Sequence, residues 1–403
     1  MAGTVVVVDT DSVVAVDTAQ TSARTMAGYA ATPTATSASV STTQAPSGTS
    51  PSADPAGGAT SAPTTVASSS AASIGGGSTK RFMGSSTVLI GGGMSDASAA
   101  AAPFDLRYAY LVSRPAPSSK YYSAKRCEAA WADWWGCWGG TPGSYVTRTD
   151  AQVAKATYKG KRRPQKMVWT WFMLHTLGDM AGKGDTLGAV GALNRADLLT
   201  LYMNDYRFFL RKVGKSHDAI DLEPDFWGFA RSQGNLNKIP AKVSSANPRD
   251  CGSQKDTVAG LARCLILMAR KYAPNAAMGL HLTCWDWPGN MQKCVKDYVK
   301  LGAKKADFLV ADISDRDAGW YAQPAHGGSN SFWTAKKAAA NLKWYKTMAE
   351  GTGKPVVLWQ IPLGNKAQNN TFHHYKDDKV DWLFAHMKQV AAAHVAALLF
   401  GPG

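Results

Sequence analysis

Four carboxylic acids fall within one short segment, with the spacing Asp218-x-x-Asp221-x-Glu223-x-Asp225. Glutamate is rare in this chain, and only Glu223 directly follows a β-like apolar run. Because side chains alternate along a strand, Asp221, Glu223 and Asp225 are expected to face the same way. Like charges held together raise the pKa of at least one carboxyl, which lets it protonate a leaving group near neutral pH. The segment predicts acid–base chemistry centred on Glu223, with the alternative that the strand ends before Pro224 and Asp225 lies in a solvated loop.

This spacing resembles the acidic strand-end motif of chitinase-type (family 18) barrels, in which spaced aspartates lead to a catalytic glutamate. The resemblance implies a secreted TIM-barrel glycoside hydrolase in which Glu223 is the acid and Asp221 is the assisting carboxylate. The family motif ends in its glutamate, whereas here Asp225 follows. The resemblance is confined to this one strand end, so it indicates the broad class of barrel glycosidases and no specific family.

A glycosidase needs two carboxylates, or one carboxylate and an assisting group of the substrate. Asp312 directly follows an apolar run and is the candidate we expect to face inward as the second catalytic carboxylate. Asp315 and Asp286 follow predicted strands as well. Asp315 belongs to an Asp-Arg-Asp run that equally fits a local ion-pair cluster in a loop. The sequence leaves open whether the reaction retains or inverts the anomeric configuration.

Aromatic and polar residues near the predicted strand ends favour sugar binding. The chain has 14 tryptophans, and flat apolar rings stack on sugar faces while polar groups bind hydroxyls. The alternative for each tryptophan is a place in the core. The residues that we expect to contact substrate are Asp225, Trp171, Trp227, His281, Trp285, Asp286, Asp315, Trp359, Gln360 and Arg107. Four more tryptophans lie in or beside the segment 127–138, which predicts a stapled loop that is either a subsite wall or a hydrophobic plug.

The elements that position these residues alternate between short apolar runs and helical patterns, which predicts parallel βαβ units. The expected strands are Phe104–Leu111, Met167–His175, Ala219–Glu223, Met278–Cys284, Asp307–Asp312, Pro355–Ile361 and Val395–Phe400. The expected helices are Arg195–Val213, Thr257–Tyr272, Met291–Leu301, Ser331–Glu350 and Asp378–Ala393. Active sites of α/β barrels lie at the carboxyl ends of the strands, where the candidate residues fall. We therefore expect a (β/α)8 TIM-like barrel, either incomplete at its C-terminus or completed by a strand at Thr87–Ile90.

The first part of the chain differs in composition from the rest. Residues 1–80 are nearly all Ala, Ser, Thr, Gly, Pro and Val, and such a segment cannot bury enough apolar surface to offset its ordering entropy. We therefore expect a disordered leader or linker at 1–80 and an α/β-barrel catalytic domain at 81–403.

Six cysteines form three local pairs in the sequence, Cys127 with Cys137, Cys251 with Cys264, and Cys284 with Cys294. This spacing favours local disulfides in an oxidising compartment, although connectivity stays open and buried free thiols are the alternative. No recognisable secretory signal begins the chain. The expected secreted or cell-surface location therefore rests on the linker and the cysteines.

The formal net charge is +15, which suggests an anionic partner and hints at an acidic glycan, unless the basic residues merely cover exposed helices. The dense basic run at 159–166 fits a solvated loop better than a nucleic-acid site. No apolar run is long enough to predict a transmembrane helix. The expected partner is a polysaccharide or oligosaccharide substrate bound by a monomer, with no nucleic acid, no cofactor and no metal.

Two rival functions remain on the same fold. One is a non-catalytic carbohydrate-binding barrel, which would keep the aromatic residues and lose the acid. The other is a metal-dependent phosphodiesterase, suggested by Glu223-x-Asp225 and Asp105-x-Arg107, for which only His175 and His281 lie near strand ends. A serine hydrolase is excluded by the lack of G-x-S-x-G, and the lack of a glycine-rich phosphate loop argues against nucleotide binding.

Overall fold

The computed structural model describes residues 82–183, 187–286, 289–314 and 316–401. The predicted leader at 1–80 lies outside the described residues, and so does Asp315.

Eight parallel strands close into a barrel in the order β1-β10-β9-β8-β7-β6-β5-β2. The barrel strands are β1 (Leu89–Gly92), β2 (Leu106–Leu111), β5 (Lys166–Trp171), β6 (Ala219–Leu222), β7 (Ala277–Leu282), β8 (Phe308–Asp312), β9 (Val356–Ile361) and β10 (Val395–Phe400). The strand expected near Thr87–Ile90 is β1, which pairs with β10 on one side and with β2 on the other. The TIM-barrel prediction is confirmed, and the barrel closes without any strand beyond β10.

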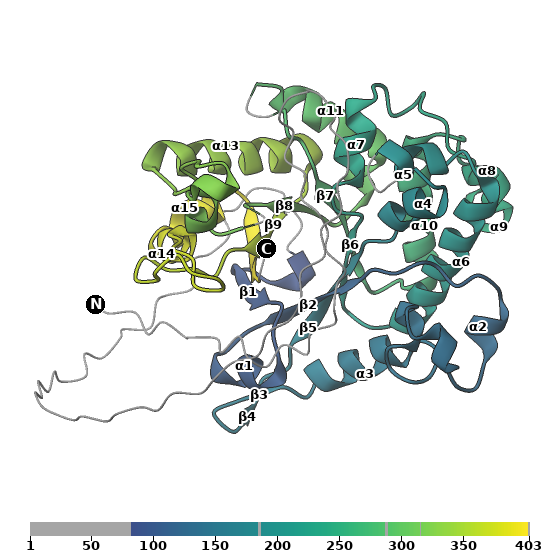
Figure 1. Cartoon of the computed structure of the whole chain (residues 1–403), viewed down its shortest axis with the longest axis horizontal. Coiled ribbons are helices and arrows are strands. Elements are labelled where there is room, and N and C mark those ends of the chain that lie inside the picture. Colours follow the sequence, from purple (N-terminus) through teal and green to yellow (C-terminus); the bar gives the residue numbers. More distant parts are fainter. Residues whose placement is uncertain (1–81, 184–186, 287–288, 315, 402–403) are drawn as a thin grey trace, which may run out of the picture. The chain divides into compact units, whose positions relative to one another are not determined.

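Helices surround the strands, as Figure 1 shows. They are α1 (Asp96–Ala101), α2 (Lys120–Ser123), α3 (Ser144–Val153), α4 (Leu174–Met180), α5 (Leu187–Ala192), α6 (Ala196–Val213), α7 (Phe226–Ser232), α8 (Val243–Ala246), α9 (Pro248–Cys251), α10 (Val258–Tyr272), α11 (Met291–Leu301), α12 (Ala318–Tyr321), α13 (Ala335–Thr352), α14 (Lys379–Ala385) and α15 (Met387–Ala392). The helix expected at Asp378–Ala393 is interrupted at His386 and becomes α14 and α15. A short antiparallel pair, β3 (Thr157–Tyr158) and β4 (Lys161–Arg162), precedes β5. Within the described ranges, no helix is long and apolar enough to cross a membrane.

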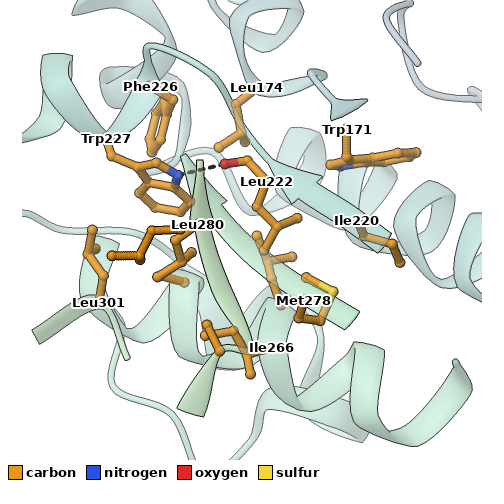
Figure 2. Close-up of a cluster of buried hydrophobic side chains, with 14 of the residues drawn as sticks. Trp171, Leu174, Ile220, Leu222, Phe226, Trp227, Ile266, Met278, Leu280 and Leu301 are labelled. Atoms are coloured by element: carbon orange, nitrogen blue, oxygen red, sulfur yellow. Dashed lines mark hydrogen bonds between the residues drawn. The ribbon is translucent and has the colours of Figure 1, made fainter. Parts of the chain in front are cut away.

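Side chains of the strands alternate between the lumen and an outer layer packed under the helices. The lumen cluster includes Leu106, Tyr108, Val168, Val310 and Trp359. The larger outer cluster contains the neighbouring residues of the same strands, and Figure 2 shows part of it, where the indole of Trp227 donates to the carbonyl of Leu222. This alternation decides which of the candidate residues can face the mouth of the barrel.

The three predicted disulfides, Cys127–Cys137, Cys251–Cys264 and Cys284–Cys294, are present. The tryptophan-rich segment around the first disulfide is a hydrophobic plug, because Trp134 and Trp135 are buried. Both indole N–H groups donate to the buried carboxyl of Asp205 on α6, Trp134 over 2.8 Å and Trp135 over 2.6 Å. The segment is thereby anchored to the outer face of the barrel.

Candidate active site

Three neighbouring strands, β6, β7 and β8, bring Asp221, His281 and Asp312 together at the carboxyl end of the barrel. Nδ1 of His281 lies 3.1 Å from Oδ2 of Asp221, and Nε2 of His281 lies 3.2 Å from Oδ2 of Asp312. Asp221 and His281 are fully buried, whereas the Asp312 side chain is 33% exposed. The imidazole therefore connects a buried carboxylate to one that reaches the mouth.

The charges of this cluster stabilise one another. Burial alone would lower the pKa of His281, but the carboxylates of Asp221 and Asp312 outweigh it and raise that pKa well above its ordinary value. Burial raises the pKa of Asp221, and the adjacent His281 opposes that shift. A protonated imidazole donates from both ring nitrogens, so His281 can donate to both carboxylates at once. Asp312 is thereby held in a fixed orientation by a charged hydrogen bond.

Aromatic rings and one amide form the rest of the mouth. The indole of Trp359 on β9 meets His281 edge to face, with ring centroids 4.9 Å apart. The same indole contacts the ring of Tyr110 on β2, with centroids 5.3 Å apart. The side-chain amide of Gln360 donates a hydrogen bond to the Tyr110 hydroxyl. Trp359 is 2% exposed, so its face is a wall of the site and is not free for a sugar to stack on.

Non-glycine residues with left-handed backbone gather at these strand ends. Glu223, Asp225 and Gln360 have φ values of 55°, 63° and 49°. Such conformations are unfavourable for residues with a Cβ and tend to occur where function requires them. At Gln360 the strand also carries a bulge, since Leu398 pairs with Leu358 whereas Phe400 pairs with Ile361. The bulge turns Gln360 toward the lumen beside Trp359, where regular alternation would have pointed it outward.

Glu223 does not lie where the sequence pattern predicts. Strand β6 ends at Leu222, and the left-handed backbone at Glu223 breaks the alternation, so the expectation that Glu223 faces the same way as Asp221 is wrong. Its carboxyl is fully buried and accepts hydrogen bonds from the backbone N–H groups of Met173 and Leu174 and from the Tyr202 hydroxyl. Burial raises the pKa of Glu223 to about 8. The side chain joins the end of β6 to the start of α4 and to α6.

Asp225 lies between β6 and α7 and is half-buried. Its side chain does not cap α7. The pKa of the Tyr110 phenol is raised well above its ordinary value, first by burial, then by Tyr108 and by the carboxylates of Asp312, Asp221 and Asp225. Asp225 thus belongs to the acidic surroundings of Tyr110, together with Asp312.

Several residues expected to contact substrate lie elsewhere. Trp171 and Trp227 are fully buried in the outer layer beneath the helices, because the strand alternation places Trp171 on the outer face and Trp227 packs on Leu222. Arg107 also faces away from the lumen, where its guanidinium pairs with Asp96 and donates to the carbonyl of Met94. These three expectations are corrected by the structure.

The loop after β7 carries two further expected residues. Trp285 is 55% exposed and contacts the ring of Phe229 on α7. Asp286 accepts from the guanidinium of Arg231, which also pairs with Asp297. Both residues lie on the mouth side of the barrel. Part of the Trp285 ring is exposed to solvent, whereas the Asp286 carboxylate is in an ion pair.

Tyr110 lies in the site although it was not among the site residues expected from the sequence. The alternation Leu106, Tyr108, Tyr110 along β2 carries the signal, because the first two are lumen residues and Tyr110 follows at the strand's carboxyl end. The pairs that suggested a phosphodiesterase do not converge: Asp105 bonds to Arg163 and to the backbone of Ile90, while Arg107 faces away from the lumen. In the part of the chain that the structure describes, no group of three or more His, Cys, Asp or Glu side chains is arranged to hold a metal ion.

No family model and no curated protein matches this sequence. Among solved structures, endo-glycoceramidase II from Rhodococcus sp. in its ganglioside GM3 complex is 10% identical over 80% of this chain and 76% of that chain, with a TM-score of 0.40. Its cellobiose-like isofagomine complex is 10% identical over the same shares, with a TM-score of 0.42. A putative lyase/mutase from Burkholderia cenocepacia J2315 is 11% identical over 78% of this chain and 76% of that chain, with a TM-score of 0.30. These likenesses identify no family, and none links the chain to the family 18 barrels, so the function has to be inferred from the site itself.

Proposed function

We propose that this barrel is a glycoside hydrolase whose reacting carboxylate is Asp312. The observation that carries the proposal is the row Asp221–His281–Asp312, in which two fully buried groups hold a third that is 33% exposed at the barrel mouth. Burying a carboxylate and an imidazole side by side is costly unless they are paired, and here the pair ends on an accessible carboxylate. The arrangement suits a carboxyl group that must be held in one orientation while it reacts.

The reaction assigned to the site is hydrolysis of a glycosidic bond. Asp312 acts on the anomeric carbon, either directly or by taking a proton from the attacking water, while a second carboxyl protonates the leaving oxygen. Asp225 is the candidate for that acid, supported by its half-buried place among the acidic residues around Tyr110. Asp221 and His281 act through Asp312 as positioning residues.

Glu223 receives a positioning role in this proposal instead of the catalytic role expected from the sequence. Both of its oxygens accept hydrogen bonds from the protein, and none of its surface is exposed. It fixes the loop that carries Asp225 to the start of α4. Its loss should therefore affect stability more directly than chemistry.

The location of this enzyme is proposed to be outside the cytoplasm, as a secreted or cell-surface protein. Three disulfides support this proposal, because such bonds persist mainly in oxidising compartments.

The test is the release of reducing ends from a panel of polysaccharides and oligosaccharides. Asp312→Asn should lower kcat by roughly 10²–10⁴-fold, the usual contribution of a group that transfers protons in the transition state. Asp307→Asn is the matched control, because Asp307 lies just before the same strand at its opposite end and is similarly exposed, at 31%. Equal activity of the two variants would overturn the assignment of Asp312. Saccharide binding by the wild type without any hydrolysis would indicate the non-catalytic binding barrel.

A further inference from the structure

One aromatic ring on the mouth side of the barrel is largely open to solvent. Among the tryptophans that the structure describes, Trp285 in the loop after β7 is the exposed one, at 55%. Tryptophans are usually covered in folded proteins, and a large apolar surface that stays exposed often marks a binding site. The ring is therefore a candidate contact for a ligand that enters the mouth.

The indole of Trp285 packs on α7. Gly228 makes this close approach possible, because a Cβ at that position would lie 2.9 Å from Cη2 of the indole. The next residue of α7, Phe229, flanks the ring, with centroids 4.9 Å apart and the two planes inclined at 57°. Part of the indole surface is thus used to seat the ring on the helix, and the exposed part faces solvent.

The chain is fixed on both sides of Trp285. The preceding residue, Cys284, is joined by its disulfide to α11. The following residue, Asp286, accepts from the guanidinium of Arg231, which is 5% exposed and also donates to the carbonyl of Thr283. A ring held on a fixed support loses little conformational entropy when a ligand covers it. The exposed ring is therefore suited to binding.

A hydrogen-bond acceptor lies about one helical turn from the ring. Gly228 and Arg231 are three residues apart on α7, so they share one face of the helix. Trp285 lies over Gly228, and the carboxylate of Asp286 is bound at Arg231. Within the described residues, the bonds to Asp286 go to Oδ1, and its side chain is 36% exposed. Its Oδ2 can accept a hydrogen bond from a ligand hydroxyl.

The ring is also close to the proposed reacting carboxylate. Strands β7 and β8 are neighbours in the barrel, with Leu282 in register with Ala311, the residue before Asp312. The spacing of residues along a chain and of neighbouring strands places the Cα atoms of Trp285 and Asp312 at most about 20 Å apart. A ligand that extends from Asp312 past the end of β7 would therefore reach the ring.

We propose that Trp285 and Asp286 form a second sugar-binding subsite, in which the indole stacks on the apolar face of a sugar ring and the carboxylate accepts from its hydroxyls. A sugar combines an apolar face with hydroxyls at its edge, which a flat ring and a nearby acceptor match. A protein partner would need a much larger surface, about 800 Å² on each side. The inference rests on the proposed function and deepens it, because the substrate then fills at least one sugar position besides that at Asp312.

The experiment measures kcat and KM for oligosaccharides of increasing length, prepared from a polysaccharide that the wild type hydrolyses. Trp285→Ala should raise KM for the longer members by ~10-fold, because the apolar contact with the ring is lost. Their kcat should stay unchanged, since the ring binds the ground state and the transition state equally. The shortest member that is hydrolysed should be unaffected, because it does not reach the ring. Trp285→Phe should recover part of the lost affinity.

Phe384→Ala is the matched control, because Phe384 on α14 is 51% exposed and stacks on Phe400. Its KM values should equal those of the wild type at every length. A Trp285→Ala variant with wild-type KM at every length would overturn the inference while hydrolysis itself stands. An equal rise of KM in Trp285→Ala and Phe384→Ala would overturn it as well.

If the wild type hydrolyses no saccharide of the panel, binding of oligosaccharides of increasing length is measured by calorimetry. Binding that strengthens with length in the wild type and is weakened in Trp285→Ala would support the subsite and contradict the proposed function. No binding at any length, with the fold intact, would contradict both.

Discussion

The hydroxyl of Tyr202 on α6 donates a hydrogen bond to Oε1 of Glu223 over 2.9 Å, beneath the loop that follows β6. The opposite oxygen accepts from the backbone N–H of Leu174 over 3.0 Å. The most conspicuous acid in the sequence is thus bonded to the helix layer around the barrel. The accessible carboxylate is Asp312, two strands away in the barrel order.

Glu223→Gln should destabilise the protein by roughly 1–3 kcal/mol, because the amide brings two N–H hydrogens where the neutral carboxyl has one O–H. Among the partners of Glu223 only the Tyr202 hydroxyl can accept a hydrogen bond, so the second amide hydrogen stays buried without an acceptor. Urea unfolding followed by tryptophan fluorescence measures the change. Glu350→Gln is the control, since Glu350 is exposed and its ion-pair distances are long, 3.8 and 3.9 Å. A Glu223→Gln variant as stable as the wild type, yet inactive, would return the catalytic role to Glu223.

Stability should fall as pH rises from about 4.5 to about 8. Burial raises the pKa of Glu223 to about 8, and it raises the pKa values of Asp205 and Asp218 to about 7. In this window the native state binds more protons than the unfolded chain, so the slope of unfolding free energy against pH is negative. Thermal unfolding at pH 5 and pH 8 measures the effect, and Glu223→Gln should flatten it. A Tm that rises over this window would contradict the buried, protonated state of these acids.

Replacement of His281 by Gln should cost roughly 3–5 kcal/mol, because it leaves the buried carboxylate of Asp221 without its charged partner. The double variant Asp221→Asn/His281→Gln should recover part of that loss. A double-mutant cycle from urea unfolding measures the coupling between the two residues. Additive losses would show that the 3.1 Å contact contributes no pairing energy.

Phe82, in the turn Phe82–Gly84, should contribute to stability without affecting catalysis. Its ring is 2% exposed and lies 4.8 Å from the ring of Phe308 at the start of β8, the end of the lumen opposite the mouth. Phe82→Ala should cost about 3–5 kcal/mol, the usual loss for a large buried aromatic side chain. Phe372→Ala is the control, because Phe372 is 75% exposed and its loss should change stability little. Unfolding in urea gives both values, and equal values would show that Phe82 is not a core residue.

The barrel could be predicted from the sequence because long apolar strands and amphipathic helices carry strong periodic signals. Val395–Phe400 and Met291–Leu301 have the predicted limits. The inward orientation of Asp312 also followed from its place at the end of an apolar run. Local cysteine spacing led to the correct disulfides.

The orientation of Glu223, Gln360 and Trp171 could not be predicted in the same way. Period-two alternation holds only while the backbone stays extended, and the positive φ values at Glu223 and Gln360 interrupt it. For Trp171, alternation did apply, but a strand buried on both faces does not reveal which face is the lumen. The row Asp221–His281–Asp312 depends on two contacts between neighbouring strands, and the residues that make them lie 60 and 31 positions apart in the sequence. No local sequence pattern contains such contacts.

The central claim is that the Asp312 carboxylate itself reacts, and the most direct measurement is chemical rescue of Asp312→Gly. The proposal predicts that this variant releases almost no reducing sugar, and that added azide restores turnover by attacking the anomeric carbon, so that a glycosyl azide forms. Product analysis by NMR identifies that compound and its anomeric configuration. An Asp312→Gly variant that keeps wild-type activity without azide would contradict the claim.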